Sequence, residues 1–191
     1  MTIRHGDHIG PYEVVALVDS GGQGEVYLAR DTRLSRDVAL KVVAGERLDL
    51  RRRARFEREA AALGALNHPN IATLFGVEYA DDVAALAMEY VEGESLAARL
   101  AGGALPVNES LQVARQIADA LEAAHGHGIL HRDLKPANVM IRRDGAIKLL
   151  DFGLAKPTAD RTARTATATL TDSDGGPAIV ASAYLEGTYS E

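Results

Sequence analysis

The chain has 191 residues, 47% of them apolar, and its 21 Lys and Arg against 27 Asp and Glu leave a formal net charge of −6. This composition is that of a globular protein, which excludes wholesale disorder, and the negative charge argues against nucleic-acid binding by bulk charge. The absence of Cys excludes a disulfide framework and a thiolate metal site. No apolar run approaches the roughly 18 residues of a membrane span, and the first residues lack the apolar core of a signal peptide.

The first half of the chain has the pattern of strands with one helix. Turn-forming clusters at residues 19–22 and 31–33 separate short runs that are rich in strand-forming residues. Further on, Phe56, Ala60 and Leu63 recur at helical spacing. The predicted elements are strands at residues 12–18, 25–30 and 38–43, a helix within 47–66 that ends before Pro69, and a hairpin of 71–79 with 83–91.

The second half begins with a long helical stripe. Apolar residues recur at helical spacing over residues 109–125, and Asn108 is placed to cap that helix. Asp144-Gly145 between two apolar runs then predicts a hairpin of 139–141 with 147–150. Residues 157–191, with six Thr between Thr158 and Thr171, have no sustained period and are interpreted as a mobile loop.

A glycine-rich stretch lies between the first two predicted strands, at residues 20–26. Backbone without Cβ atoms can approach the phosphates of a ligand and offer N–H donors to them, although an ordinary glycine-rich hairpin turn would look the same. Lys41 ends the next apolar strand. It is either an edge-strand cation or a buried charge that needs an anionic partner, and Glu59 on the following helix is a candidate for that partner.

The segment 131–138 carries most of the chemistry. His131-Arg132-Asp133-Leu134-Lys135-Pro136-Ala137-Asn138 places two cations, a carboxylate and a carboxamide within eight residues, and Asp151-Phe152-Gly153 follows a predicted strand. One carboxylate to orient a hydroxyl, an Asp and an Asn to hold a divalent metal, and a Lys to offset phosphate charge are the groups that phosphoryl transfer requires. A zinc site at His125, His127 and His131 is disfavoured, because their spacing lacks a helical i, i+4 pair with a supporting acid.

Together these motifs resemble the eukaryotic-type protein kinases. Lys135 stands where the Ser/Thr branch has it, and the style of the glycine-rich loop and the strand after it, residues 21–31, most resembles the bacterial members. The matching motifs occur in the family's order. They are the glycine-rich stretch, Val38-Ala39-Leu40-Lys41, Glu59, His68-Pro69-Asn70, Met88-Glu89-Tyr90-Val91, the segment 131–138 and Asp151-Phe152-Gly153.

The resemblance implies an α+β fold of the protein-kinase type. It predicts an N-terminal tail at residues 1–8 and an N-lobe at 9–91, with a five-stranded antiparallel sheet and one main helix. A partial, mainly helical C-lobe at 92–156 and an incomplete activation segment at 157–191 follow.

The resemblance also implies roles for individual residues. Asp133 would accept the proton of the substrate hydroxyl, Lys135 would offset charge on the γ-phosphate, and Asn138 and Asp151 would bind Mg²⁺. Around ATP, Gly21, Gly22 and Gly24 would cover the phosphates, and Lys41, held by Glu59, would contact the α- and β-phosphates. Adenine would lie between two apolar surfaces, formed by Val18, Val26 and Ala39 on one side and by Met140 on the other. It would bond to the backbone of Glu89 and Val91. Met88 would be the gatekeeper residue. Leu63, Leu74, His131 and Phe152 would form a stacked column.

Two departures from the family pattern carry expectations. Asp19 replaces the first glycine of the loop, where a carboxylate near phosphates is unfavourable. The chain also contains no Ala-Pro-Glu closure, so we expect a kinase domain that is cut within its activation segment and a helix at 111–124 with an uncovered apolar face that favours self-association.

The expected activity is ATP-dependent phosphorylation of Ser or Thr in a protein substrate, by a cytoplasmic domain whose full-length form can be membrane-anchored beyond residue 191. Because the peptide-docking half is missing, the alternative is a non-catalytic, pseudokinase-like fragment that binds nucleotide. Small-molecule kinases of related fold are disfavoured by Lys135-Pro136.

Overall fold

The computed structural model describes residues 3–21, 24–43, 50–80, 83–152, 166–169 and 180–183. The chain divides into two compact units, Met1–Lys156 and Pro157–Glu191. All of the residues that the sequence singles out for chemistry fall within the first unit by number. Two of them, Gly22 and Gly153, lie outside the described residues.

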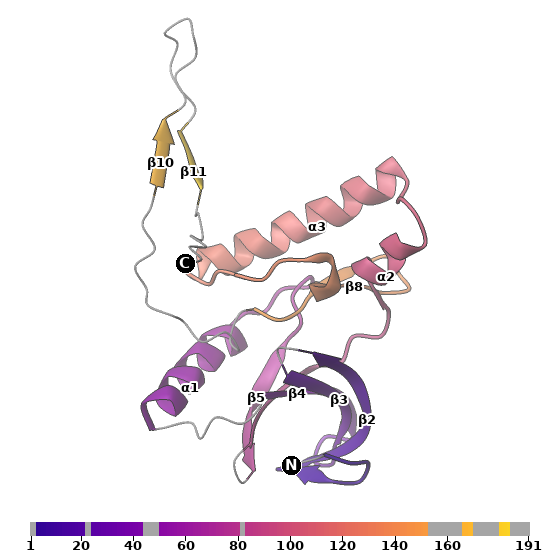
Figure 1. The fold of residues 1–191 in the computed structure, drawn as a ribbon, viewed down its shortest axis with the longest axis vertical. Coiled ribbons are helices and arrows are strands. Elements are labelled where there is room, and N and C mark those ends of the chain that lie inside the picture. The colour runs from indigo at the N-terminus through magenta and orange to yellow at the C-terminus, as the bar shows by residue number, and fades with distance from the viewer. Residues whose placement is uncertain are drawn as a thin grey trace, which may run out of the picture. The chain divides into compact units, whose positions relative to one another are not determined.

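A curved antiparallel sheet makes up the first half of this unit (Figure 1). Its strand order is β1-β2-β3-β4-β6-β5. The strands are β1 His8–Ile9, β2 Tyr12–Gly21, β3 Gly24–Asp31, β4 Arg36–Val43, β5 Leu74–Ala80 and β6 Val83–Glu89. The five predicted strands are confirmed, and the sheet gains the two-residue strand β1 at the edge beside β2.

Alternation along the strands assigns each side chain to one face of the sheet. Val38 and Leu40 are fully buried in a cluster on one face, together with Tyr27, Ala29 and Ala87. The other face is covered by helix α1, Leu50–Gly64, whose Phe56 and Ala60 pack on Ala84 and Leu86. Lys41 pairs with Leu86 across β4 and β6, and opposite residues of an antiparallel pair share a face. Lys41 therefore lies on the face that α1 covers.

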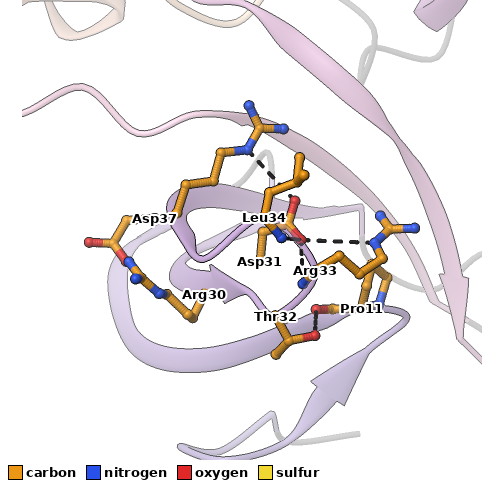
Figure 2. Close-up of polar contacts among 8 residues, drawn as sticks. Pro11, Arg30, Asp31, Thr32, Arg33, Leu34 and Asp37 are labelled. Atoms are coloured by element: carbon orange, nitrogen blue, oxygen red, sulfur yellow. Dashed lines mark hydrogen bonds and ion pairs between the residues drawn. The ribbon is translucent and has the colours of Figure 1, made fainter.

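The turn between β3 and β4 is held by the buried carboxylate of Asp31 (Figure 2). Its Oδ1 accepts hydrogen bonds from the backbone N–H groups of Arg33, at 3.0 Å, and Leu34, at 3.2 Å. Thr32 donates its hydroxyl to the Pro11 carbonyl over 2.8 Å, which ties the turn to the start of β2. An Asp that caps its own turn in this way fixes the register of β3 against β4, and hence the position of Lys41.

The second half of the unit combines two helices with a small sheet of order β7-β8-β9. In chain order these elements are β7 Glu94–Ser95, α2 Leu96–Ala101, α3 Val107–Gly126, a 3₁₀ turn at Pro136–Asn138, β8 Val139–Ile141 and β9 Ile147–Leu149. The predicted hairpin of β8 with β9 is confirmed. Val113, Ala120 and Ala124 of α3 pack in one cluster with Ile147 and Leu149 of β9.

The N-terminal cap predicted for α3 is wrong. The helix begins at Val107, its N-cap position is Pro106, and no side chain caps it. Asn108 is therefore inside the helix. The side-chain cap belongs instead to the short helix α2, which the sequence reading missed: Ser95 accepts a hydrogen bond from the Ala98 backbone N–H over 3.1 Å.

The face of α3 is partly covered. Val107 and Leu111 are 74% and 64% exposed in its first turns, whereas Val113, Ala120 and Ala124 are buried. The predicted uncovered face is thus found in part, since Ala114 and Ala118 are exposed as well as Leu111, and the self-association expected from it stays a prediction. Among the described residues, no helix is long and apolar enough to cross a membrane.

The second unit contains an antiparallel pair of strands, β10 Ala166–Thr169 and β11 Val180–Ala183. The prediction of a loop over 157–191 is wrong for these eight residues. Thr167, Thr169 and Val180 branch at Cβ and favour extended backbone, whereas the four Ala residues do not, so local preference accounts for the two strands only in part. The remainder of the predicted activation segment lies outside the described residues.

Candidate functional site

The glycine-rich hairpin joins β2 to β3. Gly21 pairs with Gly24 at its end, and Gly22 lies outside the described residues. Asp19, which replaces the family's first glycine, accepts a hydrogen bond at its Oδ1 from the Ser20 backbone N–H over 2.9 Å. The carboxylate thus contacts the backbone of the next residue, within strand β2, where Asp19 pairs with Val26 of β3.

Lys41 is a buried cation in the centre of the sheet. Strand β4 lies between β3 and β6, so the interpretation of Lys41 as an edge-strand cation is wrong. Lys41 is 5% exposed, and its Nζ lies 2.8 Å from Oδ2 of Asp151. A buried ammonium needs an anionic partner because desolvation is costly, and Asp151 is one. Glu59 lies half-buried on α1, and its pairing with Lys41 stays a prediction.

The segment 131–138 folds around the Asp133 carboxylate. Lys135 Nζ lies 2.9 Å from Oδ2 of Asp133. Asn138 donates from Nδ2 to the Asp133 backbone carbonyl at 2.9 Å and to its Oδ2 at 3.2 Å. Pro136 begins the 3₁₀ turn, a position at which the missing N–H costs nothing. Asp133, Lys135 and Asn138 are therefore in contact, as the motif predicts.

Two residues of the site have left-handed backbone that is unusual for residues with a side chain. Arg132 has φ of 62° and Asp151 has φ of 58°. Such conformations cost about 1–3 kcal/mol each and persist only where the surroundings impose them. Here the Leu150 backbone N–H donates to the Asn138 carbonyl over 2.9 Å, which joins the two segments directly.

His131 supports the segment 131–138 through contacts of its ring. It is buried, and its ring lies 4.6 Å from that of Phe152, centroid to centroid. Burial lowers the pKa of His131 from its ordinary value, against the opposing effect of the Leu150 backbone and of Asp133 and Asp151. The neutral ring can accept at Nδ1 a hydrogen bond from the Asp133 backbone N–H, at 3.4 Å. Leu63 packs in the same cluster as Phe152, and Leu74 packs in the cluster beside α1.

Strand β6 leads directly into the predicted adenine contacts. Met88 pairs with Ala39 on β4 and with Leu74 on β5. The Glu89 backbone N–H donates to the Thr73 carbonyl over 2.8 Å, and Val91 follows in irregular backbone. Among the apolar residues predicted to contact adenine, Val18 is exposed, whereas Val26, Ala39 and Met140 are half-buried.

The sequence reading missed Lys148, a buried cation on β9. Its Nζ lies 2.8 Å from Oε2 of Glu89. The signal was available, because Lys148 interrupts the apolar run Ile147 to Leu150 in the same way that Lys41 interrupts its own strand.

The oxygen donors suit a divalent metal that arrives with phosphate. No group of three or more His, Asp or Glu residues that could hold a metal occurs in the described part of the chain. Asn138 and Asp151 offer an amide and a carboxylate, and Mg²⁺ is commonly held by one or two such groups together with substrate phosphates. The donor set therefore fits Mg²⁺ in its usual role beside a nucleotide.

The site brings together ammonium groups, carboxylates and an amide. A buried ammonium contacts one carboxylate at Lys41–Asp151, and a second carboxylate at Asp133 contacts Lys135 and Asn138. The Leu150–Asn138 backbone hydrogen bond links the two clusters. Such a site can neutralise a polyanion with one cluster and accept a proton with the other.

Comparison with known proteins agrees with this geometry. A family model described as the protein kinase domain matches residues 12–185. The serine/threonine-protein kinase PknB of Mycobacterium leprae is 42% identical over 166 residues, which cover 82% of this chain and 26% of that protein. The serine/threonine-protein kinase PrkC of Bacillus subtilis is 39% identical over 158 residues, covering 80% of this chain and 24% of that protein. The chain thus spans about a quarter of the length of these relatives.

Solved structures with similar folds also align with this chain. The PknI kinase domain of Mycobacterium tuberculosis aligns with a TM-score of 0.73 and 35% identity, covering 81% of this chain and 64% of that one. A structure of Rad53 in complex with AMP-PNP aligns with a TM-score of 0.68 and 31% identity, covering 75% of this chain and 38% of that one.

Proposed function

We propose that this chain, which belongs to the protein kinase domain family, carries the catalytic centre of a Ser/Thr protein kinase. It transfers the γ-phosphoryl group of ATP to the hydroxyl of a Ser or Thr in a protein substrate. The relatives named as serine/threonine-protein kinases support this choice of acceptor, and Lys135 in the segment 131–138 supports it from the sequence.

The observation that carries the proposal is the cluster around Asp133. Its carboxylate lies 2.9 Å from the ammonium of Lys135 and 3.2 Å from the amide of Asn138. A general base must be held within hydrogen-bonding reach of the proton that it takes, and these two contacts fix its position. A neighbouring cation also suits a site at which negative charge accumulates.

In the proposed reaction, the oxygen of the substrate hydroxyl forms a bond to the γ-phosphorus of ATP. The bond from that phosphorus to the β,γ-bridging oxygen breaks, and ADP leaves with the electron pair. The hydroxyl proton passes to the carboxylate of Asp133. Lys135 offsets the charge of the γ-phosphoryl oxygens, and Lys41 offsets that of the α- and β-phosphates.

Asn138 and Asp151 would hold Mg²⁺, which when bound supplies positive charge that offsets the phosphate oxygens. Lys41 contacts Asp151 over 2.8 Å, so a cation stands next to the carboxylate that would bind the metal. The Rad53 structure, which is a complex with the nucleotide analogue AMP-PNP, supports the proposal that this chain binds a nucleotide.

The base and the phosphates would lie against the sheet. Val18, Val26 and Ala39 would contact adenine from one side and Met140 from the other, while the backbone of Glu89 and Val91 would bond to its edge. The hairpin of Gly21, Gly22 and Gly24 would cover the phosphates, because backbone without Cβ atoms can approach them closely. Glu59 would hold Lys41 from α1.

The test is transfer of label. The chain is incubated with Mg²⁺, γ-labelled ATP and a generic protein substrate, beside an Asp133→Ala variant, and the labelled residue is identified after hydrolysis. We expect phosphoserine or phosphothreonine with the unaltered chain only. Equal labelling in both would contradict the proposal, and saturable ATP binding without any transfer would favour the non-catalytic, nucleotide-binding alternative.

A further inference from the structure

A second buried cation lies beside the proposed nucleotide site. Lys148 on β9 is 9% exposed, so most of its side chain is removed from water. A lysine in such surroundings is strongly destabilising unless its ammonium is paired and hydrogen-bonded. Its Nζ contacts Oε2 of Glu89 at 2.8 Å and the Ile71 carbonyl at 3.1 Å. These contacts link β9 to the end of β6.

Glu89, the partner of Lys148, is held at several atoms. Its backbone N–H donates to the Thr73 carbonyl over 2.8 Å, and its Oε2 accepts from the Thr73 backbone N–H over 3.1 Å. The same Oε2 contacts Lys148. Both the backbone and the side chain of Glu89 are therefore fixed, and this backbone is the one proposed to bond to adenine.

Lys148 also lies beside Met140, which is predicted to contact adenine. It pairs with Met140 across β8 and β9, and opposite residues of an antiparallel pair project on the same face. Lys148 is thus the neighbour of Met140 as well as the partner of Glu89. Both residues belong to the proposed contact surface for the base.

The strand that carries Lys148 leads to the metal-binding end of the site. The Leu149 backbone N–H donates to the Asn70 carbonyl at 2.8 Å, and its carbonyl accepts from Ala72 at 3.0 Å. Asp151 then contacts Lys41. Residues 147–151 are therefore held to Asn70, Ala72 and Glu89 and, through Asp151, to Lys41.

From these contacts we propose that Lys148 is a positioning residue for the adenine end of the nucleotide. Its ammonium holds the Glu89 carboxylate, and with it the backbone that follows β6, in the place that bonds to the base. This inference rests on the proposed function. It assigns to Lys148 no contact with substrate, and it predicts that losing the cation weakens binding of the base and leaves the phosphate end unchanged.

The experiment compares two ligands that share the base. The dissociation constants of adenosine and of Mg·ATP are measured by calorimetry for the chain and for Lys148→Met. We expect both to rise by the same factor, on the order of tenfold, because misplacement of a positioned group by about 1 Å has effects of this size or larger. Lys148→Arg, which keeps a cation, should restore most of the affinity.

Two further variants serve as controls. Arg143→Gln removes an exposed cation from the β8–β9 turn and should change neither constant. Glu89→Gln keeps an oxygen for Thr73 and removes only the charge that faces Lys148, so it reports on the same contact if Lys148→Met fails to fold. Combined with Lys148→Met, it should add little, because both variants disrupt one interaction.

The outcomes separate the two proposals. If the unaltered chain binds neither ligand, the proposed function fails. If it binds both, and Lys148→Met and Glu89→Gln bind adenosine as tightly as the unaltered chain, the positioning role is overturned. A loss of Mg·ATP affinity with adenosine affinity unchanged would also overturn it, since Lys148 would then act on the phosphates.

Discussion

The sheet and the segment 131–151 place their functional residues in different ways. In the sheet, Lys41 takes its position from the regular antiparallel pairing of its strand β4 with β3 on one side and β6 on the other. In the segment, Asp133 and Asp151 stand in irregular backbone, with left-handed φ at Arg132 and Asp151. The segment is held by buried polar contacts to distant residues, such as the hydrogen bond from Asn70 Nδ2 to the Ile147 carbonyl over 3.0 Å.

The two regions therefore differ in what fixes the position of a functional side chain. A strand residue inherits its position from alternation and register, so the apolar cluster behind the strand sets where the functional side chain points. A residue in irregular backbone depends on individual hydrogen bonds, each of which matters because a buried polar group without a partner is costly. We therefore expect the sheet to be most sensitive to lost packing and the segment to lost polar contacts.

The largest expected change in stability comes from the apolar cluster of the sheet. Leu40→Ala removes a fully buried side chain next to Lys41 and should lower the free energy of unfolding by about 2–5 kcal/mol, measured by urea denaturation. Leu34→Ala, at a side chain that is 63% exposed, should change it by less than about 0.5 kcal/mol. Equal losses in both variants would contradict the assignment of the core.

A smaller loss should follow when the polar network beside the segment is broken. Gln116 Oε1 accepts from Asn70 Nδ2 at 2.9 Å and from the Ile147 backbone N–H at 3.0 Å. Gln116→Leu keeps a side chain of similar length but leaves that N–H without this partner, at a cost of about 1–3 kcal/mol. Gln112→Leu, at an exposed position one turn earlier on α3, is the matched control and should have little effect. If the two variants melt alike, the polar network does not hold the segment.

Within the sheet, the contribution of a single polar contact should be smaller than that of a buried leucine. Burial, and then the hydrogen bond of 2.7 Å to Glu25, raise the pKa of Tyr27 to about 12, so the phenol stays protonated and donates at neutral pH. Tyr27→Phe should lower stability by about 1 kcal/mol in the same denaturation assay. A loss as large as that of Leu40→Ala would contradict the contrast between packing and polar contacts.

The smallest expected effect is a change in how stability depends on pH. Burial lowers the pKa of His131 in the folded chain, so the unfolded chain takes up this proton first as the pH falls. The contribution of His131 to the stability of the folded chain is therefore fully present above its ordinary pKa of about 6.5. It is lost as the pH falls below that value. His131→Phe should reduce the loss of stability between pH 7.5 and pH 5.5, whereas His127→Gln, at an exposed site, should not. If stability depends on pH in His131→Phe as it does in the unaltered chain, the lowered pKa of His131 is contradicted.

Much of the sheet could be predicted from the sequence, because alternation and turn residues are local signals. The five strands, helix α1, helix α3 and the β8–β9 hairpin follow from period and turn chemistry. The two-residue strand β1 and the short helix α2 were missed, since elements of that length carry no measurable period. Asn108 was misplaced as a cap because Ser, Thr, Asp and Asn near a helix start give only an approximate boundary.

The site was predicted at the level of residue types and motifs. The contacts of Asp133 with Lys135 and Asn138 follow from their closeness in the chain. The pairing of Lys41 with Asp151 and that of Lys148 with Glu89 join residues far apart in sequence, and no local pattern encodes which buried cation meets which carboxylate. Such pairs depend on how the two halves pack, which only the folded chain reveals.

The central claim is that the carboxylate of Asp133 accepts the proton of the substrate hydroxyl in the transfer step. The direct measurement is the single-turnover rate of γ-phosphoryl transfer as a function of Mg·ATP concentration, in the chain and in Asp133→Asn. We predict that the limiting rate falls by about 10²–10⁴-fold while the half-saturating concentration stays the same. A limiting rate that is unchanged in Asp133→Asn would contradict the account.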